Sequence, residues 1–313
     1  MKHRRLTAVF AVFVLSLTGV LASSYVGAQD ASSIIESTPT ATPANEEVLE
    51  KDFEDFDPTN FDESTNIDNE WFPLQPGTQY IYEGSGNVDG EQIPHRVVFT
   101  VTDLTKVIGG VRSVVVWAVD YKEGKLEETE IAFFAQDNDG NVWLLGEYPE
   151  EWENGKFAKA PAWIHGAEGA RAGLAMQANP KTGTPSYSQG WGPKVGWTDR
   201  ALVDQMGLKN CVRLACYEDV LVIAESSQAE GPNAQQLKYY APGVGKIRVG
   251  WRGTEEKLQE VLELVKVEQL GPEAMKKARE EALKLDKRAY KNSKKAYGGT
   301  PPAEYLTSAA SAR

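Results

Sequence analysis

Three β-strand patterns follow one another in residues 111–147, VRSVVVWAVDYKEGKLEETEIAFFAQDNDGNVWLLGE. The first, Val111–Tyr121, carries β-branched residues on both faces, as expected of a central strand. Turn residues at 122–125 lead to a second strand pattern over 128–136, and Asp-Asn-Asp-Gly at 137–140 turns the chain back into a third. Short strands joined by tight turns, without helix-length crossovers, predict an antiparallel sheet.

The strand patterns continue on both sides of this segment. They occur at residues 78–83, 96–103, 210–224, 235–240, 246–251 and 258–269. Residues 148–200 are rich in Gly, Pro, Trp and Ala and are expected to wrap the sheet. A sheet of this size must cover or curl one face. We therefore predict a mainly β domain over 66–270: a large twisted antiparallel sheet, curled towards an open barrel and followed by a C-terminal α-helix.

The N-terminus has the pattern of a secretory signal peptide. A basic start precedes the mostly apolar run from Leu6 to Leu21, and Val26-Gly27-Ala28 fits the small-x-small cleavage rule. An uncleaved anchor is the alternative, but the run is short for a hydrocarbon layer of about 30 Å. We predict that residues 1–28 are removed and that the mature chain is extracytoplasmic, periplasmic or secreted, without a transmembrane segment. Because Cys211 is the first cysteine, we expect no lipid anchor.

Two further segments flank the predicted sheet. Residues 29–65 are acidic and polar, with Lys51 as their only base, so we predict a disordered segment that cannot offset its ordering entropy. A basic helix is predicted over 271–298, with a flexible tail at 299–313. Its apolar positions at helical spacing are Met275, Ala278, Ala282, Leu285 and Ala289.

The predicted helix has two interpretations. Residues 272–297 hold nine bases and four acids, which suits contact with an acidic surface or an anionic cell envelope. The favoured interpretation is a solvated helix that packs its apolar stripe on the sheet or on the acidic N-terminal segment of the chain. The formal charge of the whole chain is −12, which argues against nucleic acid as a partner because phosphate binding needs clustered Lys and Arg.

Residues 137–141, Asp-Asn-Asp-Gly-Asn, place oxygen side chains at alternate positions beside a glycine, as calcium loops do. The calcium-loop register fails, because Ala135 would take the first ligand position and Glu147 comes one residue late. A hairpin tip is therefore the favoured interpretation. A calcium site at Asp137, Asp139 and Glu147 is the alternative, and we expect no other cofactor.

Other titratable residues favour structural roles. Glu128 and Glu130 share one strand face, where charged side chains are expected to meet solvent. Acid–base chemistry or metal binding by this carboxylate pair is the alternative. His95 and His165 are isolated in the sequence. Cys211 and Cys216 would lie roughly 16 Å apart in one extended strand, so we expect two separate, mostly buried thiols. Export favours oxidation, however, and leaves their redox state open.

Aromatic rings are the better indication of a ligand. They either cap the core or line a groove for a sugar, a lipid or another apolar molecule. The candidate ligand-binding residues are Trp143, Trp163, Trp191, Trp197, Tyr187, Tyr239 and Tyr240.

Several short motifs resemble a family of exported bacterial β-rich proteins without an established activity. They span roughly residues 66–268. The motifs are Ile67-Asp68-Asn69, Phe72-Pro73-Leu74, Pro76-Gly77-Thr78, Ala135-Gln136-Asp137, Gly140-Asn141-Val142-Trp143, Gly146-Glu147 and Tyr239-Tyr240-Ala241-Pro242-Gly243-Val244-Gly245. The family's Asp-Trp pair before Ala-Gln-Asp is absent here, and Thr198-Asp199 keeps one acid of its acidic pair. The resemblance implies export and a β-rich fold.

These observations favour an exported, non-enzymatic protein that binds a small ligand or a cell-envelope component through an aromatic-lined sheet face. One alternative is a hydrolase that uses carboxylates such as Asp137, Glu147 and Asp199, with or without Ca²⁺. The other alternative is an envelope assembly accessory whose basic helix makes the contact. We therefore assign no catalytic residue.

Overall fold

The computed structural model describes residues 50–88, 90–228, 230–257 and 259–306. The long strands are β1 (Thr78–Val88), β2 (Glu91–Ile108), β3 (Val111–Lys122), β4 (Lys125–Gln136), β5 (Val142–Glu153), β11 (Arg200–Cys211), β12 (Cys216–Ser226), β13 (Gln235–Ala241), β14 (Gly245–Arg252) and β15 (Val261–Gln269). The short ones are β6 (Lys156–Lys159), β7 (Trp163–Ile164), β8 (Arg171–Met176), β9 (Tyr187–Ser188), β10 (Gly190–Trp191) and β16 (Glu304–Tyr305).

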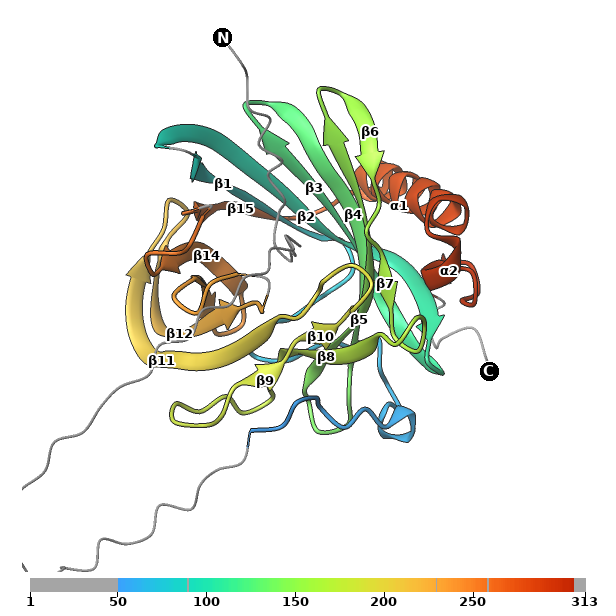
Figure 1. Ribbon diagram of the computed structural model, residues 1–313, viewed down its shortest axis with the longest axis horizontal. Helices are drawn as coiled ribbons and strands as arrows, with labels where there is room; N and C mark the ends of the chain where they lie inside the picture. The colour runs from blue at the N-terminus through green and yellow to red at the C-terminus, as the bar shows by residue number, and fades with distance from the viewer. Residues whose placement is uncertain (1–49, 89, 229, 258, 307–313) are drawn as a thin grey trace, which may run out of the picture.

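The long strands form one antiparallel sheet that curls into a nearly closed barrel (Figure 1). Consecutive strands pair from β1 to β5 and from β11 to β15, and β1 pairs with β15 to join the two groups. One seam remains at the opposite side, where β9 pairs with β11 and β10 pairs with β8. The prediction of a mainly β fold, curled towards an open barrel with a C-terminal helix, is confirmed.

The seam depends on a very close approach of two backbones. A Cβ atom at Gly173 in β8 would lie 2.2 Å from the backbone nitrogen of Gly190 and 2.5 Å from the carbonyl oxygen of Ser188. Only glycine fits there, because real Cβ contacts do not approach so closely. Gly173 therefore allows the segment between β9 and β10 to lie against β8 at the point where the barrel closes.

Helix α1 (Pro272–Asn292) packs on the outside of the barrel against β2–β5, and α2 (Lys294–Tyr297) follows it (Figure 1). Pro272 starts α1 at a position where its missing N–H is not needed. All five residues of the predicted apolar stripe are buried, so the favoured interpretation of a stripe packed on the sheet is confirmed. Within the described residues, no helix is both long and apolar enough to cross a membrane.

Both segments that flank the domain are more ordered than the sequence predicted. In the structure, residues 50–65 pack against the barrel: the Phe56 ring lies 5.3 Å from that of Trp143, and Ser64 Oγ donates to the carbonyl of Arg112. The isolated phenylalanines predict too little burial to order this segment, but in the structure the Phe56 ring packs on Phe61 and Trp143. Residues 304–305 of the predicted tail form β16 on β2. The predicted signal peptide and residues 29–49 and 307–313 lie outside the described residues.

The prediction of two separate thiols is wrong. Cys211 and Cys216 form a disulfide, with their Cα atoms 3.9 Å apart. They end β11 and begin β12, and the amide of Val212 donates to the carbonyl of Ala215 across the intervening turn. The sequence prediction placed residues 210–224 in one strand because residues 212–215 carry no Gly, Pro, Asn or Asp turn signal.

Candidate functional site

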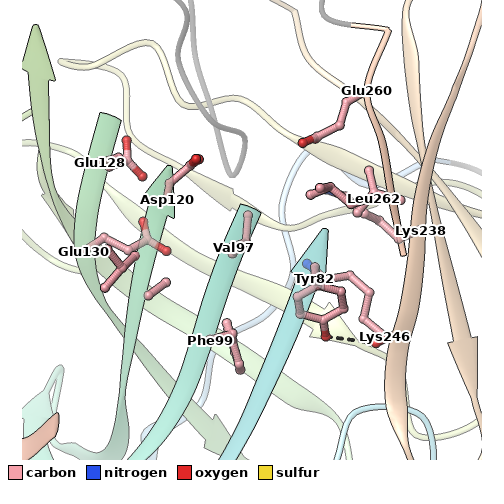
Figure 2. Close-up of a pocket in the computed structure, with 13 residues that line it drawn as sticks. Tyr82, Val97, Phe99, Asp120, Glu128, Glu130, Lys238, Lys246, Glu260 and Leu262 are labelled. Atoms are coloured by element: carbon pink, nitrogen blue, oxygen red, sulfur yellow. Dashed lines mark hydrogen bonds between the residues drawn. The ribbon is translucent and has the colours of Figure 1, made fainter. Parts of the chain in front are cut away.

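The lumen of the barrel contains a cavity of about 70 Å³. This volume is room for roughly five water molecules at 10–15 Å³ each. One wall comes from β1–β4 and the other from β13–β15, with both apolar and charged side chains (Figure 2). The apolar and aromatic lining is Tyr82, Val97, Phe99, Ala118, Val119, Val249 and Leu262, and the charged lining is Asp120, Glu128, Glu130, Lys238, Lys246 and Glu260.

Strand register explains how these residues meet. Tyr82 pairs with Val97, Val97 pairs with Asp120, and Asp120 pairs with Glu128 across four neighbouring strands. Directly paired residues point to the same side of a sheet, and residues two apart on a strand do so as well. Glu128 and Glu130 therefore both point into the lumen, where they are 6% and 7% exposed. The prediction that this face meets solvent is wrong, because the sheet curls around it.

His95 holds two carboxylates together at the edge of this cavity. Its Nε2 lies 2.7 Å from Asp120 Oδ1, and its Nδ1 lies 2.6 Å from Glu260 Oε1. Burial disfavours a charged ring, but the two carboxylates outweigh it and raise the pKa of His95 to about 9. His95 is therefore an imidazolium at neutral pH, which fits the structural role predicted for it.

Several other carboxyl oxygens in the lumen are buried without a hydrogen-bond partner among the described residues. They include Asp120 Oδ2, Glu128 Oε2, Glu130 Oε2 and Glu147 Oε1. Burial, reinforced by the neighbouring acids, raises the pKa of Glu128 and Glu147 well above the usual range. Burial also raises the pKa of Glu130 to about 7. Glu130 is therefore partly protonated near neutrality, and the unpaired oxygens are able to accept a cationic or donor-rich partner.

Two lysines face the carboxyls from the opposite wall (Figure 2). Lys238 Nζ donates to Gln236 Oε1 at 2.7 Å and lies 3.5 Å from Glu225 Oε2. Lys246 Nζ lies 5.4 Å from the ring centroid of Tyr82 and forms no hydrogen bond or ion pair with any residue that the structure describes. Burial, together with the charge of Lys238, lowers the pKa of Lys246 to about 8.

The candidate calcium ligands lie in two different places. Asp137 is at the β4–β5 turn, where its carboxylate accepts from the amides of Asp139 and Asn141 and from Trp143 Nε1. Asp139 accepts from Asn60 Nδ2. Glu147 instead pairs with Ala132 and Trp163 in the barrel wall. In the described part of the chain, no group of three His, Cys, Asp or Glu residues is arranged to hold a metal ion.

None of the seven predicted ligand-binding aromatics lines the cavity. Trp163 and Trp197 stack 5.7 Å apart beside the seam, and both lie against Gly190. The other rings pack individually: Trp143 on Phe56, Trp191 on Phe53, Tyr240 on Phe72, Tyr239 near Arg248, and Tyr187 buried in β9. Asp199, the remaining acid of the hydrolase alternative, is buried, and its charge raises the pKa of Glu147.

Of the residues that line the cavity, only Glu128 and Glu130 stand out in the sequence, and there their charges predict a solvent face. A usable signal was present, because charges at Asp120, Glu128 and Glu130 interrupt otherwise apolar strand faces in two consecutive strands. Lys238 and Lys246 repeat that pattern in the second half of the barrel. Charges at alternate positions indicate either a solvent face or a polar lumen, and only closure of the barrel decides between them.

No protein-family model matches the chain, and no curated protein matches it. Among solved structures, the chain is similar to a candidate exported protein with a YmcC-like fold from Bacteroides fragilis, with 12% identity and a TM-score of 0.35, over 64% of this chain and 99% of that one. It is also similar to a candidate lipoprotein from Parabacteroides distasonis, with 12% identity and a TM-score of 0.32, over 63% and 97% of the two chains. Neither similarity is high enough to transfer a function.

Proposed function

We propose that the chain is an extracytoplasmic binding protein that holds a small polar molecule in the lumen of its barrel. The observation that carries this proposal is a cavity lined by Asp120, Glu128 and Glu130, each of which has one buried oxygen without a hydrogen-bond partner among the described residues. Such groups destabilise the folded state, and buried polar atoms in proteins are otherwise almost always paired. Clusters of titratable groups with shifted pKa values in a cavity are typical of functional sites.

The lining favours a ligand that is both polar and partly apolar. Tyr82 and Phe99 offer ring surface, while Asp120, Glu128 and Glu130 offer acceptor oxygens. The ligand surface that we propose contains charges as well as rings, which differs from the aromatic-lined face expected from the sequence. The small volume favours a compact molecule rather than a polymer chain.

Two observations support a location outside the cytoplasm. The N-terminal sequence has the basic, apolar and small-residue zones of a signal peptide. The disulfide between Cys211 and Cys216 is at the exposed end of a hairpin, where it would be reduced in a cytosol.

Acid–base catalysis is the second candidate function. A carboxyl whose pKa is about 7, as for Glu130, is suited to donate or accept a proton near neutrality. Asp137, which the sequence offered for a hydrolase, is engaged in the β4–β5 turn and would not take part. An enzyme would use Glu128 and Glu130 instead, on a substrate small enough for the lumen.

Thermal unfolding with a small-molecule panel tests the proposal. The panel contains a neutral sugar (glucose), a carboxylic acid (acetate), an amine (ethanolamine) and an amino acid (glycine). A ligand at 100 times its Kd stabilises by about 2.7 kcal/mol, which for a chain of this size raises Tm by roughly 5–10 °C. Ala118→Leu fills the cavity and should remove the shift.

The outcomes separate the candidates. If no compound raises Tm, or if the shift persists in Ala118→Leu, the lumen is not a binding site. If a compound binds and is converted to a product that chromatography detects, the protein is an enzyme. Glu268→Gln, at a half-exposed position of β15, is the control that should behave like the unsubstituted protein.

A further inference from the structure

We infer that the lumen binds a small zwitterion, with its ammonium group among Asp120, Glu128 and Glu130 and its anionic group at Lys246. This inference rests on the proposed function and names the chemical class of its ligand. It corresponds to an amino acid with a small side chain, or a short ω-amino acid.

The ammonium end follows from strand register. Asp120 in β3 pairs directly with Glu128 in β4, and Glu130 is two residues further on the same face. Directly opposed side chains have Cβ atoms about 4.5–5.5 Å apart, and like charges at such positions repel each other. Each of the three carboxyls has one buried oxygen without a hydrogen-bond partner in the described structure. An ammonium group offers three N–H donors, one for each of these oxygens.

A metal ion is the weaker explanation for this cluster. Among the residues that the structure describes, no three His, Cys, Asp or Glu side chains are arranged for metal coordination. An ammonium group bonds carboxylates at about 2.7–2.9 Å, farther than the oxygen distances that Mg²⁺ or Ca²⁺ requires. We therefore prefer a nitrogen cation to a metal ion at this cluster.

The anionic end follows from the opposite wall. Lys246 in β14 extends towards Tyr82 and into the cavity (Figure 2), and it has no ion-pair partner in the part of the chain that the structure describes. Lys238, by contrast, is engaged by Gln236 and Glu225. A carboxylate or another anionic group on the ligand would restore the interactions that Lys246 loses on burial.

The space between the two walls limits the size of the ligand. The cavity holds roughly five water-sized groups. Val97 and Phe99 lie between the carboxyls of one wall and the lysines of the other (Figure 2), and Leu262 also lines the cavity, so the middle of the ligand meets apolar surface. A ligand with a short aliphatic segment between two charged ends matches this order of carboxyls, apolar side chains and lysine across the cavity.

Proton exchange should accompany binding. Burial raises the pKa of Glu128 well above its usual value and that of Glu130 to about 7, and an ammonium group would displace the protons that these carboxyls hold. For one displaced proton, affinity should rise up to tenfold per pH unit from pH 5 towards pH 7, and should fall above about pH 8 as Lys246 loses its charge. The charged groups that face or influence these residues are His95, Asp120, Glu147, Glu151, Glu225, Lys238 and Glu260.

Isothermal titration calorimetry on the disulfide-bonded chain tests this inference. The zwitterionic probes are glycine, β-alanine and 4-aminobutanoate. Ethylamine and propionate each carry one of the two charged groups, and glycerol is the neutral probe. We expect at least one zwitterion to bind ten times more tightly than ethylamine or propionate at pH 7.5. Glu130→Gln should weaken the binding of zwitterions and of ethylamine at least tenfold. Lys246→Met should reduce the affinity for zwitterions to the affinity for ethylamine.

Controls separate this inference from the proposed function. Ala118→Leu should abolish binding of every probe, and Val97→Phe fills the same cavity if that variant does not fold. Glu268→Gln should leave all affinities unchanged. If glycerol, glucose or propionate binds in the lumen and no zwitterion does, the inference is wrong while the proposed function stands. If no compound of any class binds, both are wrong.

Discussion

Strands β2–β5 bury charged side chains on both of their faces, and the two faces satisfy those charges differently. On the outer face, beneath α1, Lys106 Nζ lies 2.9 Å from Asp286 Oδ1, 3.0 Å from the hydroxyl of Tyr290 and 2.6 Å from the carbonyl of Pro301. Asp286 also accepts from the hydroxyl of Tyr297 and the amide of Ala303. Every charge in this cluster has several partners.

Two further ion pairs complete the outer face. Arg288 donates two hydrogen bonds of 2.8 Å to Glu150, and Arg279 binds both oxygens of Asp103. The geometry is the two-pronged one that makes arginine–carboxylate pairs strong. These contacts fix α1 on the barrel along most of its length.

On the inner face of the same strands, the buried carboxyls are only partly paired. Asp120, Glu128, Glu130 and Glu147 each keep a buried oxygen without a hydrogen-bond partner in the described residues. The same strands can therefore satisfy buried charges fully, and on the lumen side they do not. This difference indicates that the outer charges stabilise the fold, whereas the inner ones are retained at a cost to stability, as functional groups often are.

The largest expected effect is on the outer face. Lys106→Met leaves Asp286 buried without its cation and should destabilise the chain by about 3–5 kcal/mol. Denaturant unfolding monitored by circular dichroism measures the change. Lys106→Met combined with Asp286→Asn should recover part of the loss, because no uncompensated charge remains. If Lys106→Met is as stable as the unsubstituted chain, the outer cluster does not stabilise the fold.

His95 provides a test within the lumen, because it forms ion pairs with two of the lumen carboxylates, Asp120 and Glu260. Its pKa is raised to about 9 from 6.5 in the folded chain. The stabilisation of about 3 kcal/mol implied by that difference should be complete below pH 6.5 and lost as the pH rises through about 9. His95→Gln should therefore be less stable by that amount at pH 6 and nearly equal above pH 9. A constant difference across this range would exclude the imidazolium bridge.

The sequence predicted the barrel wall well because local patterns determine it. Alternating β-branched residues and tight turns placed β1–β5 and β13–β15 close to their observed positions, and helical spacing identified the buried stripe of α1. The hairpin at Cys211 and Cys216 was missed because its turn is stabilised by pairing and the disulfide rather than by turn residues.

The candidate site was not predictable to the same degree. Whether Glu128 and Glu130 face solvent or a lumen depends on the pairing of β1 with β15, which joins strands about 180 residues apart in the sequence. Lys246 reaches the same cavity only through that pairing. The aromatic residues selected from the sequence are large and frequent in loops, but in the structure they fill the seam and the core.

Removing a carboxyl from the inner face should raise the free energy of unfolding, whereas removing a charge from the outer face should lower it. Glu130→Gln should stabilise the chain by about 1–2 kcal/mol at pH 8, where the buried carboxyl would otherwise be ionised. Since its folded pKa is about 7 against 4.5 unfolded, its favourable contribution is complete below pH 4.5 and lost as the pH rises through 7. The gain should therefore nearly vanish at pH 5.

Thermal unfolding of Glu130→Gln at the two pH values measures this difference. Glu268→Gln, at an exposed pair with Lys266, should change stability by less than about 0.5 kcal/mol at either pH. If Glu130→Gln destabilises the chain at pH 8, the inner carboxyls contribute to the fold and the contrast between the two faces fails.

The smallest expected effect on stability comes from a charge on the solvent side of α1. It tests whether the charges of the outer face stabilise the chain because they are buried or because they lie on the helix. Lys284 lies 2.8 Å from Glu281 in an i,i+3 pair whose side chains are 58% and 37% exposed. Lys284→Gln should reduce the free energy of unfolding by less than about 0.5 kcal/mol, because solvent and salt screen exposed pairs. A loss above 1 kcal/mol, removed by added salt, would mean that surface charge on α1 stabilises the chain, so the effect of Lys106 could not be assigned to its buried partners.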